Sequence, residues 1–493
     1  MKTKDSERPN ILLIIADQWR ADCLGIAGHP VVKTPHLDAL AQEGAYFSHA
    51  YCAVPSCVAA RAALLTGLHQ KNHGFVGYND FRAWNYDCPL PQVFSEQGYH
   101  TQAVGKMHVY PTRKLLGFHN VVLHDGYLHR DRRKGMDYDY LDDYSHWLKS
   151  QHRSFEVDYT ASGLDCNGYA VQLWPYSERQ HPSAWVAQES IRFLQRRDPE
   201  KPFFLFSSFH RPHPPLDPPQ SCYLRYQDAP IPQSPVGDWV DFPQQTRAVP
   251  EAPVPTRADE IADAKRAYYA QMTFIDAQIN RLMLALREQD AYDNTIVCFI
   301  ADHGEMLYDH HLIAKTVPFE GSVKIPWIVW LSPKLRQKYG IRSQQQIEQI
   351  VELRDVFASL CDFAELPISP GLDGKSILPL LQGQSPQWRN YLHGEHIDFH
   401  DHQNNRNWGN HWLCDGKHKY CWFSADGREL LFDLARDPQE CCDLSARKPE
   451  DLALWRQRLA SELTGRPEGY VANGRLVAGR KGKAVLENSR NLP

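Results

Sequence analysis

Continuous apolar runs along the chain predict strands that are buried on both faces. The first, Ile11–Ala16, contains only Ile, Leu and Ala, a pattern typical of central strands in a parallel sheet. Similar runs follow at Phe203–Phe206, Thr295–Ile300 and Trp327–Trp330. Between them, Ala184–Gln195 and Asp259–Arg287 have the composition and apolar spacing of helices. Strands that alternate with helices predict an α/β fold, with a mostly parallel, doubly wound sheet flanked by helices.

The pattern changes after about residue 370, and we expect three regions. Residues 1–370 form a large N-terminal domain, and residues 371–464 form a smaller α+β domain of short strands and a helix at Pro449–Leu463. Residues 465–493 hold six Lys or Arg against two Glu; this basic tail either wraps a neighbouring subunit of a homo-oligomer or is mobile. Twelve of the 34 prolines lie in 212–255, which predicts a long surface loop.

Composition narrows the functional class. The chain has 493 residues and a net charge of −5, which argues against nucleic-acid or membrane-surface partners because these favour a basic excess. No apolar run approaches the roughly 20 residues that span a bilayer. The 12 cysteines show no repeated spacing, as expected of reduced thiols. The first apolar run is also too short for a secretory signal, so we expect a cytoplasmic protein.

Polar residues directly after two predicted strands suggest a metal site. Asp17 and Gln18 follow the first strand, and Asp302 and His303 follow the run at Thr295–Ile300. The carboxyl ends of parallel strands are where such sheets bind ligands, and two carboxylates with an imidazole suit a divalent ion. Taken singly, each pair is more often a helix cap or a solvated turn.

A second group of residues indicates anion binding. Cys57 begins a helix-forming stretch that ends at Gly67, and Arg61 follows one turn later. Helix N-termini attract anions, although a lone cysteine there is usually just buried. Basic residues follow other predicted strands or loops: Lys106, His108, His213 and Lys315. Together with the candidate metal site, these basic residues predict a binding site for the ester of a tetrahedral oxyanion.

These motifs, in this order, resemble the sulfatase family of the alkaline-phosphatase-like superfamily. Cys57–Gly67 is similar to the family signature in which Cys-x-Pro-x-Arg precedes Ala-x-Leu-Leu-Thr-Gly. Other segments that resemble family landmarks are Pro9–Asp17, Thr34–Ala41, Gly105–His108, Asp373–Ser376, Leu431–Leu434 and Asp437–Glu440. The resemblance spans nearly the whole chain and makes residues 1–370 the catalytic domain.

The resemblance implies a sulfuric ester hydrolase that cleaves sulfate monoesters and releases sulfate and an alcohol. Cys57 would be converted to formylglycine by a maturation enzyme and would act as the nucleophile. Asp17, Gln18, Asp302 and His303, with the modified Cys57, would bind one divalent metal. Arg61 would hold the formylglycine. Lys106 and Lys315 would bind sulfate oxygens, His108 would act as the base, and His213 would donate to the substrate or leaving oxygen.

Three positions depart from the usual sulfatase pattern. Ala59 replaces the proline of the modification motif, as in some relatives, which leaves maturation of Cys57 open. Gln18 replaces an aspartate and His303 replaces an asparagine. Losing a charge and gaining a nitrogen ligand should weaken a strict preference for Ca²⁺ and admit Mn²⁺.

Two other functions remain open at this stage. The chain has features similar to choline sulfatases and phosphonate monoester hydrolases, so a phosphonate monoester hydrolase or phosphodiesterase could use the same site. The phosphonate branch lacks the Lys and His that this chain has at 106 and 108, which favours the sulfatase. The other alternative is a sulfated-glycan-binding pseudoenzyme that never matures. The alcohol part of the small-molecule ester, for which we favour a carbohydrate, is not encoded in any motif.

Overall fold

An eight-stranded, mostly parallel sheet forms the centre of the computed structural model, which describes residues 8–126, 141–152, 157–240, 255–368, 371–397 and 409–486. Its strand order is β5-β4-β6-β1-β7-β8-β2-β9. The strands are β1 (Asn10–Asp17), β2 (Ala45–Phe47), β4 (His100–Gly105), β5 (Asn120–Leu123), β6 (Phe203–Pro212), β7 (Thr295–Ala301), β8 (Trp327–Leu331) and β9 (Gln345–Ile347). The predicted α/β fold class is confirmed.

Strand direction changes beside β7. The five strands from β5 to β7 are parallel to their neighbours, whereas β8 is antiparallel to both β7 and β2. The apolar run of β8 is buried at every position, like that of β1. Burial on both faces explains both runs, and it carries no information about direction.

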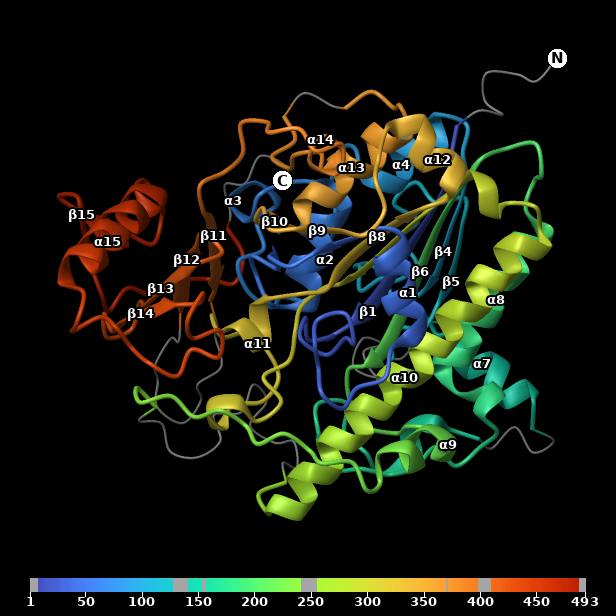
Figure 1. Cartoon of the computed structure of the whole chain (residues 1–493), viewed down its shortest axis with the longest axis horizontal. Coiled ribbons are helices and arrows are strands. Elements are labelled where there is room, and N and C mark those ends of the chain that lie inside the picture. Colours follow the sequence, from blue (N-terminus) through green and yellow to red (C-terminus); the bar gives the residue numbers. More distant parts are fainter. Residues whose placement is uncertain are drawn as a thin grey trace.

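Helices cover the two faces of the sheet (Figure 1). On one side, α8 (Pro182–Arg196) and α10 (Ala258–Glu288) pack together and against β6, close to the predicted bounds of both helices. On the other, α2 (Cys57–Thr66) contacts α4 (Leu90–Glu96) and α13 (Arg354–Phe363). Apart from the C-terminal helix Pro449–Leu463, the other α-helices of the described residues are short: α1 (Pro35–Glu43), α3 (Gln70–His73), α7 (Asp143–Ser150), α9 (Gln220–Tyr223), α11 (Glu320–Val323), α12 (Pro333–Tyr339) and α14 (Leu378–Leu381).

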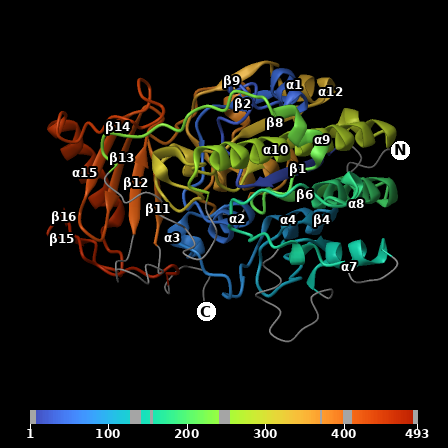
Figure 2. The ribbon, with the colours of Figure 1, turned by 90° about the horizontal axis from the view of Figure 1, so that it is seen from below.

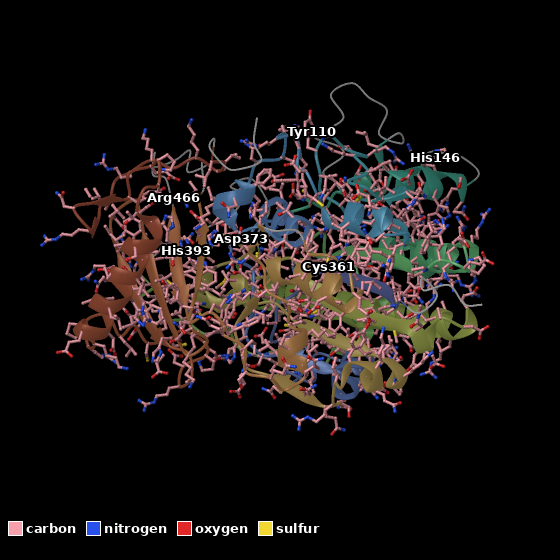
Figure 3. The ribbon with its side chains drawn as sticks, turned by 90° about the horizontal axis from the view of Figure 1, so that it is seen from above. Tyr110, His146, Cys361, Asp373, His393 and Arg466 are labelled. Atoms are coloured by element: carbon pink, nitrogen blue, oxygen red, sulfur yellow. The ribbon has the colours of Figure 1, made fainter. Side chains whose placement is uncertain are left out.

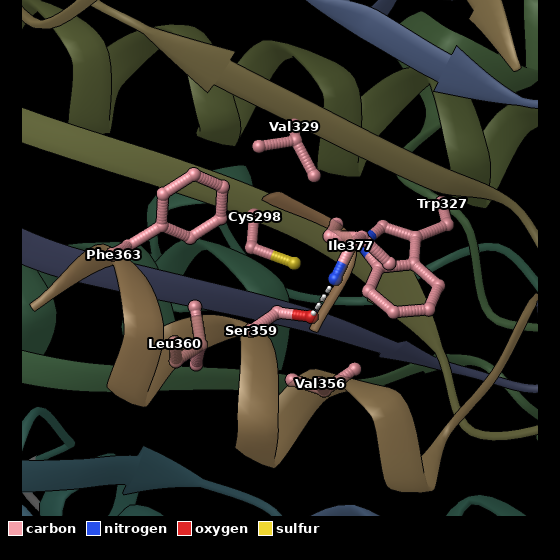
Figure 4. A pocket seen from close by; sticks show the side chains of 8 residues that line it. All are labelled: Cys298, Trp327, Val329, Val356, Ser359, Leu360, Phe363 and Ile377. Carbon is pink, nitrogen blue, oxygen red and sulfur yellow. Dashed lines mark hydrogen bonds between the residues drawn. The ribbon is translucent and has the colours of Figure 1, made fainter. Parts of the chain in front are cut away.

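The contact between α13 and the sheet is apolar and closely packed (Figure 4). Cys298 of β7 and Trp327 of β8 face Val356 and Phe363 of α13. The Ser359 hydroxyl also lies among them, and it accepts a hydrogen bond of 3.1 Å from the Ile377 backbone N–H. This core packs against β7, the strand that directly precedes Asp302.

A second, antiparallel sheet lies at one end of the molecule (Figure 2). It has the order β11-β12-β13-β14, and α15 (Pro449–Leu463) packs against β12 and β13 with the predicted bounds. The strands are β11 (Leu392–His396), β12 (Asn410–Cys414), β13 (His418–Phe423) and β14 (Glu429–Asp433). Two small two-stranded sheets complete the fold: β3 (Ala50–Tyr51) with β10 (Val351–Glu352), and β15 (Val471–Ala472) with β16 (Arg475–Leu476).

The described part of the basic tail, residues 465–486, packs on its own chain. Tyr470 is fully buried, and the backbone N–H of Leu486 donates to Gly74 O. Ala484 O in turn accepts from the Val76 backbone N–H. Apolar side chains between the basic residues account for this packing, which a charge count does not reveal.

After β6 ends at Pro212, the described part of the proline-rich segment is mostly loop and includes a β-bridge at Leu216, α9 and a short 3₁₀ turn at Leu224–Tyr226. Residues 241–254 of this predicted loop lie outside the described residues. Among the helices in the described part of the chain, none is long and apolar enough to cross a membrane.

Candidate active site

The carboxyl ends of four adjacent strands bring most of the predicted site residues together. Asp17 ends β1, and Asp302 follows β7, which is paired with β1 in the register Ala16↔Ala301. On the other side of β1, β6 ends at Pro212, which lies opposite Asp17, and His213 follows. Lys106 directly follows β4. The site therefore lies at the edge of the sheet where the carboxyl ends of the parallel strands meet.

Cys57 is the first residue of α2 and lies at the centre of this group. The helix runs to Thr66 and ends at Gly67, whose φ of 68° is the left-handed conformation that favours glycine. Cys57 is 4% exposed. Its Sγ lies 3.1 Å from His303 Nε2, 3.7 Å from Asp17 Oδ1 and 3.6 Å from Lys106 Nζ.

Four side chains at this point could hold a metal ion. One donor atom each from Asp17, Cys57, Asp302 and His303 lies within 4.8 Å of the other three, and all four residues are buried. His303 Nδ1 contacts Gly304 O at 3.0 Å, which orients Nε2 toward Cys57. Such oriented imidazoles and paired carboxylates are the ligands expected of a divalent-cation site.

Arg61 and Lys106 bring positive charge to the same place. Arg61 Nε donates to Asp302 Oδ2 at 3.0 Å, and Nη1 donates to Lys106 O and Ser208 Oγ. Arg61 Nη2 is buried and has no hydrogen-bond partner among the described residues. The Lys106 ammonium donates to Asp17. Lys106 thus contacts both the carboxylate and the Cys57 sulfur.

Lys315 joins the site from a loop that follows β7. Its Nζ donates to Gln18 Oε1 at 2.7 Å and lies 2.9 Å from His213 Nε2. His213 Nδ1 contacts Pro214 O at 2.8 Å, so Nδ1 carries the hydrogen and Nε2 accepts from Lys315. Burial and the neighbouring Lys315 hold the pKa of His213 well below its usual value, which keeps this imidazole neutral.

His108 is positioned by two aspartates. Its Nε2 lies 2.9 Å from Asp80 Oδ1, and its backbone N–H donates to Asp125 Oδ1 at 3.1 Å. The backbone has a φ of 55°, a left-handed conformation that these contacts fix. His108 Nδ1 is buried and has no hydrogen-bond partner among the described residues.

The charges in the site shift one another's pKa values. Burial tends to raise the pKa of Asp17, but Lys106 and other nearby cations hold it well below its usual range. Burial and Asp17 together raise the pKa of Asp302. Burial and Asp17 also act to raise the pKa of Cys57, yet the cations around it hold it well below that of an ordinary thiol. The site is thus built to stabilise negative charge at position 57.

Several residues that support the site were not identified from the sequence. Glu305 is completely buried and accepts hydrogen bonds from Gln18 Nε2, Tyr169 Oη and two backbone N–H groups. Asp80, Asp125 and Ser208 hold His108 and Arg61. Glu305 lies three residues after Asp302, and this proximity was the only sequence signal available for any of them.

Comparison with known proteins identifies the family. The model of the family described as Sulfatase matches residues 9–366, and a model described as N-sulphoglucosamine sulphohydrolase, C-terminal, matches residues 308–465. The chain is 42% identical over 482 residues to an arylsulfatase of Clostridium perfringens, covering 96% of this chain and 98% of that protein. It is also 26% identical to arylsulfatase K of Gallus gallus, over 91% of this chain and 81% of that protein.

Solved structures share the fold. A phosphonate monoester hydrolase of Agrobacterium radiobacter superposes with a TM-score of 0.75 at 26% identity, covering 92% of this chain and 95% of that one. A protein solved with D-glucosamine-2-N,6-O-disulfate gives a TM-score of 0.71 at 17% identity, covering 92% of this chain and 97% of that one. The chain belongs to the sulfatase family of the alkaline-phosphatase-like superfamily, and it is a sulfatase, an enzyme that hydrolyses sulfate esters.

Proposed function

We propose that this sulfatase hydrolyses small sulfate monoesters through a formylglycine made from Cys57 and one divalent metal ion. The observation that carries the proposal is the place of Cys57. It begins α2 with its Sγ 3.1 Å from His303 Nε2 and 3.6 Å from Lys106 Nζ, beside Asp17. The formylglycine oxygens would occupy the position of this sulfur, between the ligands of a cation and the donors for a sulfate group.

The residues present fit a divalent ion. Asp17 and Asp302 supply carboxylate oxygens, His303 supplies a nitrogen, and position 57 supplies a further donor. Gln18 Oε1 has one lone pair engaged by Lys315 and one left for a ligand bond. This mixed set suits Ca²⁺ or Mn²⁺. Such an ion, when bound, polarises the nucleophile and neutralises sulfate oxygens.

In the first step, one hydroxyl of the formylglycine hydrate would attack sulfur and release its proton, the bond between sulfur and the alcohol oxygen would break, and the alcohol oxygen would take up one proton, so that the step releases no net proton. The products are a sulfate ester at position 57 and the free alcohol. Lys106 contacts the Cys57 sulfur and Lys315 contacts His213, and both lysines would bind the sulfate oxygens. Arg61 Nη2 would bind the hydrate.

The leaving oxygen needs a proton in this step. Because His213 is neutral and accepts from Lys315 through Nε2, we infer that the two act as a pair. The ammonium group of Lys315 would donate a proton toward the substrate, and His213 would hold that ammonium group in place. The sequence predicts that His213 donates to the substrate or the leaving oxygen; in the arrangement inferred here, Lys315 is the donor and His213 positions it.

In the second step, a base removes the proton of the remaining hydroxyl, the carbon–oxygen bond to sulfate breaks, and the aldehyde reforms. Water then restores the hydrate, so the net reaction consumes one water per ester. We assign the base to His108, whose Nδ1 has no hydrogen-bond partner among the described residues while Asp80 orients Nε2.

Mass spectrometry of the peptide that contains Cys57 tests the proposal. Formylglycine is lighter than cysteine because one oxygen replaces sulfur and two hydrogens. We expect the modified peptide, together with aryl sulfate turnover, after coexpression with a formylglycine-generating enzyme. A Cys57→Ala variant should lose turnover and keep its fold by circular dichroism. Unmodified thiol in every preparation would instead support a sulfated-glycan-binding protein that does not mature.

Phosphonate monoester hydrolysis is the alternative, and the similarity to the Agrobacterium radiobacter enzyme favours it. The contact of Lys106 with Cys57 argues for sulfate. It places a cation beside the nucleophile, and the phosphonate branch lacks this lysine. The comparison to make is kcat/KM for an aryl sulfate and the matching aryl phosphonate. A large excess for the phosphonate would overturn the sulfate assignment.

We propose a small sulfated carbohydrate as the natural substrate. Two observations support this class: the solved relative that holds a sulfated glucosamine, and curated relatives named for ulvan and iduronate. Turnover of a panel of sulfated sugars, choline sulfate and aryl sulfates by matured enzyme would rank the substrate classes. Higher kcat/KM for choline sulfate than for every sugar would reject the carbohydrate.

A further inference from the structure

A second buried cluster of metal-ligating side chains lies in the C-terminal sheet, outside the active site. His393 and Glu395 are on β11, and His411 is on the neighbouring strand β12. One donor atom from each lies within 4.8 Å of the others, and all three residues are buried. None of them has a part in the sulfatase mechanism proposed above.

Strand geometry places the three side chains on one face. Glu395 and His411 are directly opposite in the antiparallel register, and His393 precedes Glu395 by two residues. Alternate residues of a strand share a face, and opposite residues are cross-strand neighbours. The His393 and His411 rings stack with centroids 5.8 Å apart and planes 13° apart.

Three of the four histidine ring nitrogens in this cluster have no hydrogen-bond partner among the described residues. His411 is completely buried, and neither of its ring nitrogens has a partner among the described residues; the same is true of His393 Nε2. A buried polar group without a partner destabilises the folded state, because it loses its hydrogen bonds to water and gains none in return. Buried unpaired groups of this kind call for an explanation such as an ion.

The distance between His411 and Glu395 fits two ligands of one ion. His411 Nδ1 lies 3.6 Å from Glu395 Oε2, too far for a good hydrogen bond. Two ligands that each lie about 2.0–2.1 Å from a tetrahedral zinc ion are separated by roughly 3.4 Å. Glu395 also retains lone pairs, because a carboxylate has about four acceptor positions.

Neighbouring groups orient the cluster and leave it with negative charge. Arg466 donates to both oxygens of Glu395, at 2.9 and 3.0 Å, and also to Glu468 at 2.7 Å. One guanidinium is therefore shared by two carboxylates. Gln70 Nε2 lies 3.0 Å from His393 O and 3.5 Å from His393 Nδ1. Figure 3 labels His393 and Arg466 near each other in the C-terminal part of the molecule.

We propose that His393, Glu395 and His411 bind a structural transition-metal ion, for which their chemistry favours zinc. Two imidazoles and one carboxylate are a known zinc ligand set, whereas Ca²⁺ prefers oxygen ligands alone. The ion links β11 to β12. Through Glu395 and Arg466 it also ties the start of the C-terminal tail to the sheet, since ligand carboxylates are usually held by such outer hydrogen bonds.

Metal analysis of the purified full-length chain tests this site. A D17N/D302N variant weakens the catalytic site and leaves the second cluster intact. After incubation with zinc and gel filtration into metal-free buffer, we expect this variant to retain about one zinc per chain. Adding His411→Phe, which preserves an aromatic ring beside Trp422, should lower zinc affinity at least tenfold. Unchanged zinc content after this substitution would overturn the proposal.

Two further measurements do not depend on the variants folding. X-ray absorption of zinc-loaded wild-type chain that contains Ca²⁺ in the catalytic site should show a zinc shell with two imidazoles. Zinc should also raise the Tm of the wild-type chain, and a zinc chelator should reverse the increase. Failure to bind either zinc or cobalt when added in excess would reject the site, whatever the activity of the enzyme.

Discussion

Replacing Glu305 by glutamine tests whether this buried carboxylate positions the cationic side of the active site. Four donors converge on it: Gln18 Nε2, Tyr169 Oη at 2.6 Å, and the backbone N–H groups of Leu307 and Ala314 at 2.8 and 2.7 Å. Glutamine has the same shape, but it substitutes an NH₂ group for one oxygen, so at least one of these donors faces another donor.

The decrease in the free energy of unfolding depends on which hydrogen-bond donor loses its acceptor. Gln18 Nε2 and Tyr169 Oη both donate to Oε2. Placing the new NH₂ there sacrifices the bond from Gln18 and requires the Tyr169 hydroxyl to turn and accept, whereas the other orientation sacrifices two backbone bonds. The first orientation leaves one buried donor unsatisfied and should lower the free energy of unfolding by about 1–3 kcal/mol. Gln18 would then turn its amide, and Lys315 would lose its 2.7 Å hydrogen bond to Gln18 Oε1.

A hydrogen bond to a charged group contributes about 1.5–3 kcal/mol, which corresponds to a loss of roughly 10- to 150-fold in kcat/KM. The assay is aryl sulfate hydrolysis by matured enzyme, with urea unfolding in parallel. Tyr169→Phe is the matched control, because it removes one hydroxyl from Glu305 and keeps the bond between Glu305 and Gln18; we expect less than about a fivefold loss.

A double-mutant cycle decides whether Glu305 acts through Lys315. In a Lys315→Ala background, E305Q should lower kcat/KM by no more than about twofold, because the contact that it disturbs is already absent. An equal loss in both backgrounds would refute the reasoning, and so would full activity of a folded E305Q enzyme.

Three other predictions concern the nucleophile, the metal and pH. Lys106→Met should lower kcat/KM for aryl sulfate by at least about 100-fold, since it removes a buried cation from the nucleophile, and should change aryl phosphonate hydrolysis far less; equal losses would contradict the sulfate assignment. Removing divalent metal by chelation should abolish turnover, and Ca²⁺ or Mn²⁺ should restore it; full activity of chain verified as metal-free would contradict the metal role. Burial raises the pKa of Asp276 to about 7, so the folded chain retains a proton that the unfolded chain releases near pH 4. The free energy of unfolding should therefore fall between about pH 4 and pH 7, and D276N should show a shallower fall; identical slopes in urea unfolding would contradict this.

Local pattern predicted strands of the central sheet and brought Asp17 and Asp302 to one candidate metal site. Asp17 and Asp302 each end or follow an apolar run, and a parallel sheet brings such ends together, so their meeting needed only the inference that both strands belong to one sheet. The identity of neighbouring strands and the direction of β8 could not be derived, because both depend on contacts between distant parts of the chain.

The supporting residues could not be predicted for a similar reason. Glu305 is recognisable only once Gln18, Tyr169 and the loop to Lys315 are seen to converge on it. His393 and His411 are separated by 17 residues and become neighbours through an antiparallel register. A histidine-rich composition is compatible with many such pairings and selects none.

Burial of Cys57 limits when the proposed conversion to formylglycine can take place. Every residue of α2 is buried, and Cys57 itself is 4% exposed, so a maturation enzyme cannot reach the thiol once this helix has docked. The proposed oxidation therefore competes with folding, and a chain that folds first becomes a stable, inactive by-product. The active fraction of a preparation is then set by a ratio of two rates. Conditions that slow folding should increase that fraction even when the amount of maturation enzyme is constant.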